Sequence, residues 1–145
     1  MNLSLTGSRH QLINQLVYFD EELHQFLELY FPSPTKSRTY TEERLQEYSE
    51  ALTDLISEFS EELLHSKVLI GSKVQIRYLD DNESDTYSIV FPSKTDPSSN
   101  RISFLSPIGS HLLLGTREQT FTIQTPSGEC SVRIEDIRYM NAGDV

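Results

Sequence analysis

One stretch of the sequence decides how the fold is interpreted: Ser106-Pro107-Ile108-Gly109-Ser110-His111-Leu112-Leu113-Leu114-Gly115. Serine is a favoured helix N-cap, proline is tolerated at the first helical position, and glycine often follows the last turn. The stretch therefore predicts a short helix that begins after Ser106 and ends near Gly115. Because its neighbours in sequence have a different periodicity, we expect this helix to cross the open side of a β-sheet.

The residues on both sides of this helix alternate between apolar and polar, which is the period of a half-exposed β-strand. Five short runs have apolar positions at Val74, Ile76 and Tyr78; Tyr87, Ile89 and Phe91; Ile102 and Phe104; Phe121 and Ile123; and Cys130, Val132 and Ile134. Turn-forming residues separate the runs at 80–82, 92–100 and 126–128. Five short strands with one solvated face predict a mostly antiparallel sheet.

The first part of the chain follows a heptad pattern instead. Apolar side chains recur every three or four residues in two runs without Gly or Pro: Leu12, Leu16, Phe19, Leu23, Phe26 and Tyr30, then Leu45, Tyr48, Leu52, Leu55, Phe59 and Leu63. This spacing is typical of helices packed along a narrow seam. Pro32 and Pro34 predict a loop over 31–40, after which Thr39 with Glu42, or Thr41 alone, caps the second helix.

The patterns predict an α+β fold in two parts. Residues 1–66 form an antiparallel helical hairpin (coiled coil), and residues 67–145 form an antiparallel β-sheet domain with one short helix. The narrow apolar stripe favours a hairpin that projects from the sheet as a rod of roughly 33 Å. In the alternative arrangement both helices lie flat on the sheet as a layer. The wider apolar face around Ile13 and Ile56 allows some packing of this kind.

Charge is distributed unevenly along the 145 residues, whose formal net charge is −10. Residues 1–66 carry 4 basic and 12 acidic side chains, whereas residues 67–145 carry 8 and 10. An acidic balance argues against nucleic acid as the primary partner, since that affinity comes largely from Lys and Arg. It suits a basic cleft on another macromolecule.

The sequence predicts a bacterial-style cytoplasmic protein without a membrane partner. No run approaches the roughly 20 apolar residues of a membrane span, and Met1-Asn2-Leu3-Ser4 has neither the basic nor the apolar region of a signal peptide. The single cysteine, Cys130, fits a reducing compartment. We expect a monomer, although exposed heptad positions would allow helix exchange between chains.

Catalytic and metal-binding motifs are sparse, and no cofactor is expected. The sequence has no glycine-rich phosphate loop, its four histidines are scattered, and Cys130 lies in strand register, where a small core residue is expected. The acidic run Asp80–Asp85 lacks the Gly and Glu of a calcium loop and is interpreted as a hairpin turn. Glu42 and Glu43 beside the predicted loop either help to hold magnesium in a partner's active site or favour the helix macrodipole.

Several stretches of the second part resemble the C-terminal domain of the Gre transcript-cleavage factors (the GreA/GreB family) and their relatives, including the Rnk-type regulators of nucleoside diphosphate kinase. The matching stretches are 68–74, 85–90, 100–109, 112–115 and 125–129. The most specific feature is Ile102-Ser103 with Ser106-Pro107, followed by Leu113-Leu114-Gly115. Val90–Lys94 and Ile108-Gly109 resemble the Rnk branch slightly more.

The resemblance implies an FKBP-like domain that docks on the rim helices of RNA polymerase at the mouth of its secondary channel. Carried over to this chain, the docking residues are Ser106, Pro107, Ile108 and Gly109, with His111 added by proximity. The hairpin would then lie at or in the channel, where any contact with nucleic acid is indirect. Prolyl isomerase activity does not follow from such a fold.

The chain departs from the cleavage factors at the hairpin tip. The resemblance implies a tip with an Asp-x-x-Glu arrangement, which helps to bind a catalytic magnesium in the cleavage factors. In this chain residues 31–41 contain no acid, and the adjacent Glu42 and Glu43 do not have that spacing. We therefore expect a non-enzymatic regulator that binds RNA polymerase. The alternatives are a transcript-cleavage factor that uses Glu42 or Glu43, and an interaction module for a partner other than polymerase.

Overall fold

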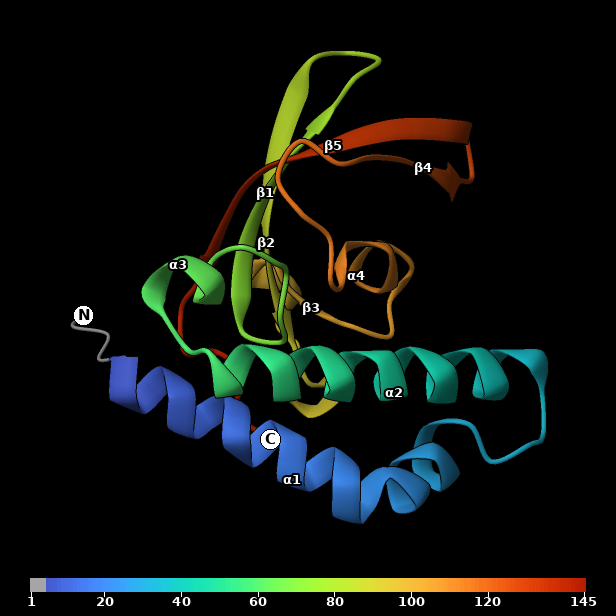
Figure 1. The fold of residues 1–145 in the computed structure, drawn as a ribbon. Helices are drawn as coiled ribbons and strands as arrows, with labels where there is room; N and C mark the ends of the chain where they lie inside the picture. Colours follow the sequence, from blue (N-terminus) through green and yellow to red (C-terminus); the bar gives the residue numbers. More distant parts are fainter. Residues whose placement is uncertain (1–4) are drawn as a thin grey trace.

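The computed structural model describes residues 5–145, so positions 1–4 of the predicted hairpin lie outside the described part (Figure 1). Its helices are α1 (Leu5–Tyr30), α2 (Lys36–Ser57), α3 (Glu61–Leu64) and α4 (Pro107–Leu112), and 3₁₀ turns occupy Pro92–Lys94 and Pro97–Ser99. Its strands are β1 (Ser72–Tyr78), β2 (Glu83–Val90), β3 (Arg101–Ser103), β4 (Thr120–Thr125) and β5 (Gly128–Tyr139). The predicted α+β class, a helical hairpin followed by a sheet with one short helix, is confirmed.

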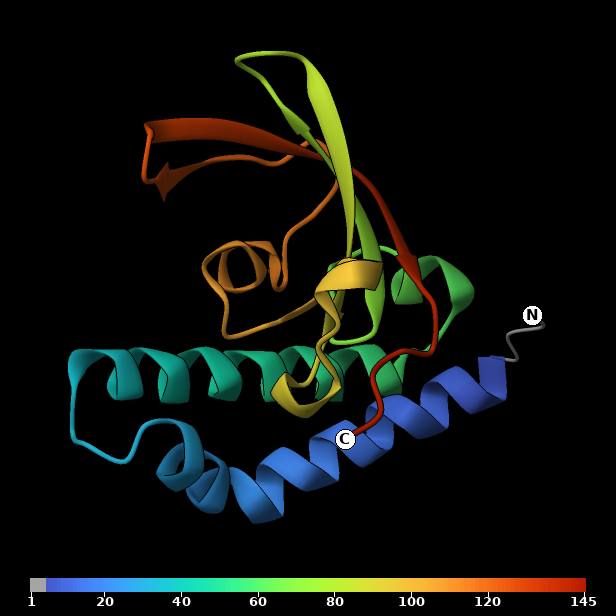
Figure 2. The ribbon, with the colours of Figure 1, turned by 180° about the vertical axis from the view of Figure 1, so that it is seen from behind.

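The sheet contains the five predicted strands in the order β3-β2-β1-β5-β4. All neighbouring pairs are antiparallel except β2 and β3, which are parallel because the 3₁₀ turns carry the chain back between them. A register shift between Gln75 and Ile76 interrupts the β1–β5 ladder. Such bulges increase local twist, and Figure 1 and Figure 2 show the sheet curling above the helices.

The predicted short helix α4 lies between this curled sheet and α2 (Figure 1, Figure 2). Ser106 is its N-cap and Pro107 its first residue, as expected. The helix ends at Leu112, and Leu114 rather than Gly115 adopts a left-handed backbone, with φ of 65°. Gly115 is needed for a different reason: a Cβ atom there would lie 2.5 Å from Ile134 Cδ1.

The heptad seam forms the antiparallel hairpin of α1 and α2. Its buried side chains are Leu12, Phe19, Phe26, Leu45, Tyr48, Leu52 and Leu55. Both predicted caps of the second helix were wrong, because Thr35 caps α2 by accepting a hydrogen bond from Arg38 N at 3.2 Å. The second run was also expected to be one helix through Leu63, but α2 ends at Ser57 and Ser60 caps the separate helix α3.

The hairpin packs beneath α4 and the ends of β2 and β3 rather than projecting freely (Figure 1), so the favoured rod was the wrong alternative. The rings of Phe19 and Phe91 stack with centroids 5.7 Å apart, and those of Phe26 and Phe104 stack at 5.7 Å. Polar contacts continue towards the other end of α1, where Ser8 Oγ donates to Asn141 Oδ1 at 2.8 Å. The side chains in these aromatic contacts are large and apolar. Packing the hairpin on the rest of the chain therefore removes more apolar surface from water than a projecting hairpin would.

Helices and sheet therefore share one hydrophobic core. The division of the chain into residues 1–66 and 67–145 stays a sequence prediction. Within residues 5–145, no helix has the length and apolarity that crossing a membrane requires.

Candidate functional site

The N-terminal end of α4 is held rigidly by Ser106. Its hydroxyl donates to the carbonyl of Ser103 at 2.7 Å and accepts from Gly109 N at 3.0 Å. Both hydrogen-bonding roles of the hydroxyl are thus used within the chain. Ser106 fixes the start of the helix, where Pro107 is exposed.

Gly109 has a structural role in the same turn. It is buried, and a Cβ atom there would lie 2.1 Å from the carbonyl oxygen of Ser103 and 2.8 Å from Ser106 Oγ. The absence of a side chain lets α4 approach the loop that precedes it. Ile108 is half-buried against the core. Of the five predicted docking residues, the structure therefore exposes only Pro107 and His111.

Pro107 and His111 are four residues apart, so they share one face of α4. The imidazole of His111 stacks on the ring of Phe121 in β4, with centroids 5.5 Å apart and planes 10° from parallel. Phe121 is half-buried and extends this exposed surface onto the sheet. The local pattern around Phe121 predicts only a strand, because nothing in it indicates that β4 lies beside α4. Pro107, His111 and Phe121 form the candidate docking surface, called the docking surface below.

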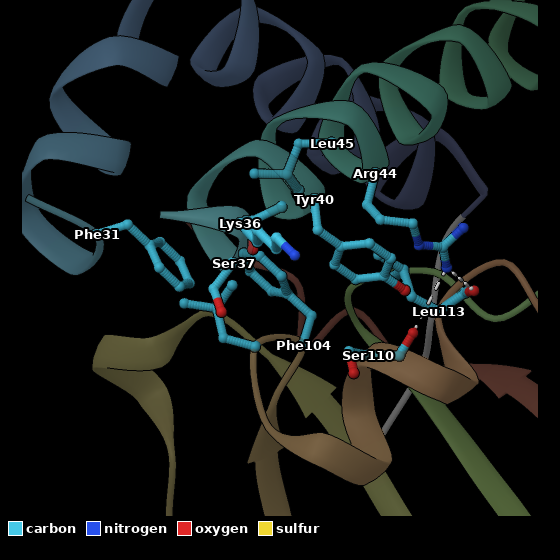
Figure 3. A pocket seen from close by; sticks show the side chains of 11 residues that line it. Phe31, Lys36, Ser37, Tyr40, Arg44, Leu45, Phe104, Ser110 and Leu113 are labelled. Carbon is cyan, nitrogen blue, oxygen red and sulfur yellow. Dashed lines mark hydrogen bonds between the residues drawn. The ribbon is translucent and has the colours of Figure 1, made fainter. Parts of the chain in front are cut away.

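Arg44 ties the other end of α4 to the hairpin. Figure 3 shows its guanidinium reaching from α2, where it donates to the carbonyls of Leu113 at 2.8 Å and Ser110 at 3.5 Å. The same group pairs with Glu47 at 3.2 Å. A cation at the carboxyl end of a helix satisfies free carbonyl groups there. No local pattern in the sequence indicates this link, because only the packing of α2 beside α4 brings Arg44 to these carbonyls.

Glu42 and Glu43 lie farther along α2 than expected. Since the helix begins at Lys36, neither acid is in its first turn, and the macrodipole interpretation was wrong. Neither carboxylate has an ion-pair or hydrogen-bond partner among residues 5–145. As neighbours on a helix they point about 100° apart. No group of three or more potential metal ligands is found in the described part of the chain.

The hairpin tip (residues 28–40) is apolar and basic. Leu29 is 71% exposed and Tyr40 is 54% exposed. Glu28 is neutralised by Arg38, whose guanidinium lies 2.9 Å from it and also donates to the carbonyl of Phe31 at 2.8 Å. The tip thus presents rings and aliphatic side chains to solvent, in contrast to the acidic remainder of both helices.

Cys130 and His65 are both half-buried. Burial is the main cause that raises the pKa of Cys130, so its thiol stays protonated near neutral pH. His65 Nδ1 accepts a hydrogen bond from Tyr139 N at 2.8 Å. The predicted hairpin turn lies between β1 and β2 and includes residues 80–82 of the acidic run, whereas residues 83–85 pair with β1 as the start of β2.

A helical hairpin followed by a curled five-stranded sheet with one short helix is a GreA-like α+β fold. Residues 63–139 match the model of the transcription elongation factor GreA/GreB C-terminal region, which is more than half of the chain. The chain belongs to the GreA/GreB family.

Individual relatives agree with this assignment. Transcription elongation factor GreA of Helicobacter pylori (strain Shi470) is 34% identical over 110 residues, which cover 76% of this chain and 66% of that protein. GreA of Listeria monocytogenes serotype 4a (strain HCC23) is 43% identical over 70 residues, covering 48% of this chain and 44% of that protein. The match thus spans just under two thirds of the Helicobacter relative.

A solved structure shares the fold. The transcription elongation factor GreA/GreB from Nitrosomonas europaea superposes with a TM-score of 0.57 at 24% identity, covering 82% of this chain and 93% of that one. The nearer likeness to the Rnk branch and the FKBP-like description of the sheet domain stay predictions.

Proposed function

We propose that the protein is a transcription regulator that binds RNA polymerase through its docking surface, at the rim of the secondary channel, and does not itself catalyse transcript cleavage. Membership of the GreA/GreB family supports the choice of partner. The family also supports a cytoplasmic location. The chain would act as a monomer and meet nucleic acid only within the elongation complex.

The geometry of α4 supports docking at this surface. Pro107 and the His111–Phe121 stack are presented on one side, while Ser106, Gly109 and Arg44 hold the helix in place from behind. A surface whose supports are already formed loses little conformational freedom on binding. Aromatic residues such as Phe121 are enriched at the cores of protein interfaces, where charged residues are depleted.

The composition of the hairpin tip carries the proposal that the protein is non-catalytic. Residues 31–41 contain no acid, whereas Lys36 and Arg38 bring positive charge to this end of the hairpin. Divalent magnesium binds carboxylate oxygens, and the adjacent Glu42 and Glu43 point too far apart to chelate one ion together. The residues present do not fit the shared magnesium site of a cleavage factor.

The packing of the hairpin supports the same conclusion. α1 has 26 residues, a length of about 39 Å at 1.5 Å per residue. Its contacts with the rest of the chain begin at Ser8 and reach Phe26, so little of its length is free to extend beyond the sheet. A hairpin held in this way suits occupation of the channel entrance better than contact with the catalytic centre.

The direct test is binding to core RNA polymerase, with transcript cleavage scored in the same stalled complexes. We expect Pro107→Ala to weaken binding about threefold to tenfold, and Ser106→Asp, which keeps an N-cap, to weaken it at least as much. Pro97→Ala is the matched control, since Pro97 is also exposed and begins a 3₁₀ turn elsewhere. Equal binding of all variants would show that α4 does not take part in the interface with polymerase.

The transcript-cleavage assay distinguishes a non-catalytic regulator from a cleavage factor. We expect no stimulated transcript cleavage with the wild-type protein. If cleavage occurs and is lost in the double variant Glu42→Gln/Glu43→Gln without loss of binding, the protein is a cleavage factor. If the wild-type protein does not bind polymerase at all, the proposal is wrong and an interaction module for another partner replaces it.

A further inference from the structure

A pocket lies between the hairpin tip and the segment that leads into α4 (Figure 3). Its volume is about 360 Å³, which is within the usual range for small-molecule sites. One wall comes from the tip and α2, and the opposite wall comes from residues 104–113. The residues used below are Phe31, Lys36, Ser37, Tyr40, Arg44 and Phe104.

Three aromatic side chains line the pocket: Phe31, Tyr40 and Phe104. Phe104 is only 3% exposed and forms the floor, Phe31 is half-buried, and Tyr40 is 54% exposed at the rim. Flat apolar surfaces of this kind favour a ring system, which they contact by stacking or by edge-to-face packing.

The charged groups that line the pocket are all cations. In a chain with 22 acidic and 12 basic side chains, no Asp or Glu within residues 5–145 lines this space, whereas Lys36 and Arg44 do. Arg44 is already engaged with Leu113, Ser110 and Glu47. Lys36 points into the pocket in Figure 3, and its ammonium has no partner among the described residues.

We infer that this pocket binds a small aromatic anion: a ring system seated against Phe31, Tyr40 and Phe104, with one carboxylate, sulfate or phosphate group paired to Lys36. Ring and anion recognition come from different residues, so they can be tested separately. Since the walls belong to different parts of the chain, a bound molecule would hold the tip against α4. Any resulting effect on polymerase rests on the proposed function, whereas the binding itself does not.

Two fluorescent dyes separate the contributions of ring and charge. The probe is 8-anilinonaphthalene-1-sulfonate, and the neutral comparison is N-phenyl-1-naphthylamine, which has the same rings without the sulfonate. We expect the sulfonate dye to bind the folded wild-type protein more tightly than the neutral one. Lys36→Gln should weaken the sulfonate dye about threefold to fivefold, as for one exposed ion pair, and leave the neutral dye within about twofold.

A second pair of variants locates the site. Ser37→Trp places an indole in the pocket and should abolish binding of both dyes, while Ser57→Trp, at the exposed far end of α2, should not. Lys73→Gln is the charge control on an exposed strand position. Backbone amides of residues 36–44 should exchange hydrogen more slowly when the sulfonate dye is bound.

Three results would overturn the inference. The first is equal affinity for the two dyes, which removes the anion preference. The second is dye binding that Ser37→Trp leaves intact in a protein whose circular dichroism is unchanged, which places the site elsewhere. The third is no binding of either dye to the folded wild-type protein.

Discussion

The hydroxyl of Tyr48 lies 2.6 Å from Oε1 of Gln15 and donates a hydrogen bond to it, which joins α2 to α1 inside the core. The same hydroxyl accepts from Ile70 N at 2.9 Å, and Gln15 Nε2 donates to the carbonyls of Ile70 and Gly143 at 2.8 and 2.9 Å. These two fully buried side chains therefore tie both helices to the start of the sheet domain and to the C-terminal segment.

Loss of the Tyr48 hydroxyl is expected to destabilise the fold. Tyr48→Phe leaves Gln15 Oε1 and Ile70 N without their buried partner, and we expect the free energy of unfolding to fall by about 1–3 kcal/mol. Urea denaturation followed by circular dichroism measures this. Tyr40→Phe, at an exposed ring, serves as the matched control and should change stability by less than about 0.5 kcal/mol. Equal losses from the two variants would contradict the assigned role.

Gly109→Ala is expected to distort the start of α4. The new methyl group would overlap the carbonyl oxygen of Ser103, and overpacking of this kind destabilises by about 1–3 kcal/mol. The same change at Gly128 (φ 121°) adds backbone strain but meets no atom within 4 Å. Thermal unfolding measures the loss of stability in both variants. Binding to core RNA polymerase then separates the two causes, because Gly109→Ala should weaken it and Gly128→Ala should leave it unchanged.

Arg44 is expected to support the docking surface from behind. Arg44→Ala leaves the carbonyls of Leu113 and Ser110 without their charged donor, and hydrogen bonds to charged groups contribute about 1.5–3 kcal/mol. Because the side chain is partly exposed, we expect the lower part of this range. Arg9→Ala, at an exposed position in α1, is the control. Faster hydrogen exchange confined to α4 in Arg44→Ala would support the assignment, and unchanged exchange there would refute it.

His65 is expected to make stability depend on pH. Burial, followed by the charge of Arg138, lowers its pKa below the ordinary value of 6.5, while Tyr139 N donates to the unprotonated Nδ1. The unfolded chain therefore binds a proton more readily than the folded one. The stabilising contribution is full above pH 6.5 and is lost as pH falls from there through the lower folded pKa.

The measurement is urea denaturation at about pH 7.5 and about pH 5. In His65→Asn the amide oxygen replaces Nδ1 as acceptor without titrating, so this variant should lose less stability between the two pH values than the wild-type protein does. His10→Asn, at an exposed position, should behave like the wild-type protein. A His65→Asn variant with the wild-type pH dependence would assign the effect to other groups.

Most of the secondary structure could be predicted because its signals are local. The alternation around Val74 and Ile76 and the Ser106-Pro107 cap act within a few residues, and both produced the expected elements. The errors arose where two local signals competed. Thr35, Thr39 and Thr41 are all suitable caps, but α2 begins at Lys36, so only Thr35 has the extended backbone of an N-cap.

The candidate site was predictable only in part. The sequence pointed to residues 106–109 and 111, but burial separates Pro107 and His111 from Gly109, and burial depends on the whole fold. Phe121 and Arg44 were missed, since each reaches α4 from an element distant in sequence.

By itself, the sequence determined the hairpin, the five strands, the short helix and the acid-free tip, because periodicity, capping and composition are properties of neighbouring residues. Only the tertiary structure decided that the hairpin lies against the sheet. The narrow heptad stripe favours a projecting rod, but it is also compatible with helices that pack on the rest of the fold. The choice comes from burying Phe19 and Phe26 against Phe91 and Phe104, a contact between parts of the chain that are distant in sequence.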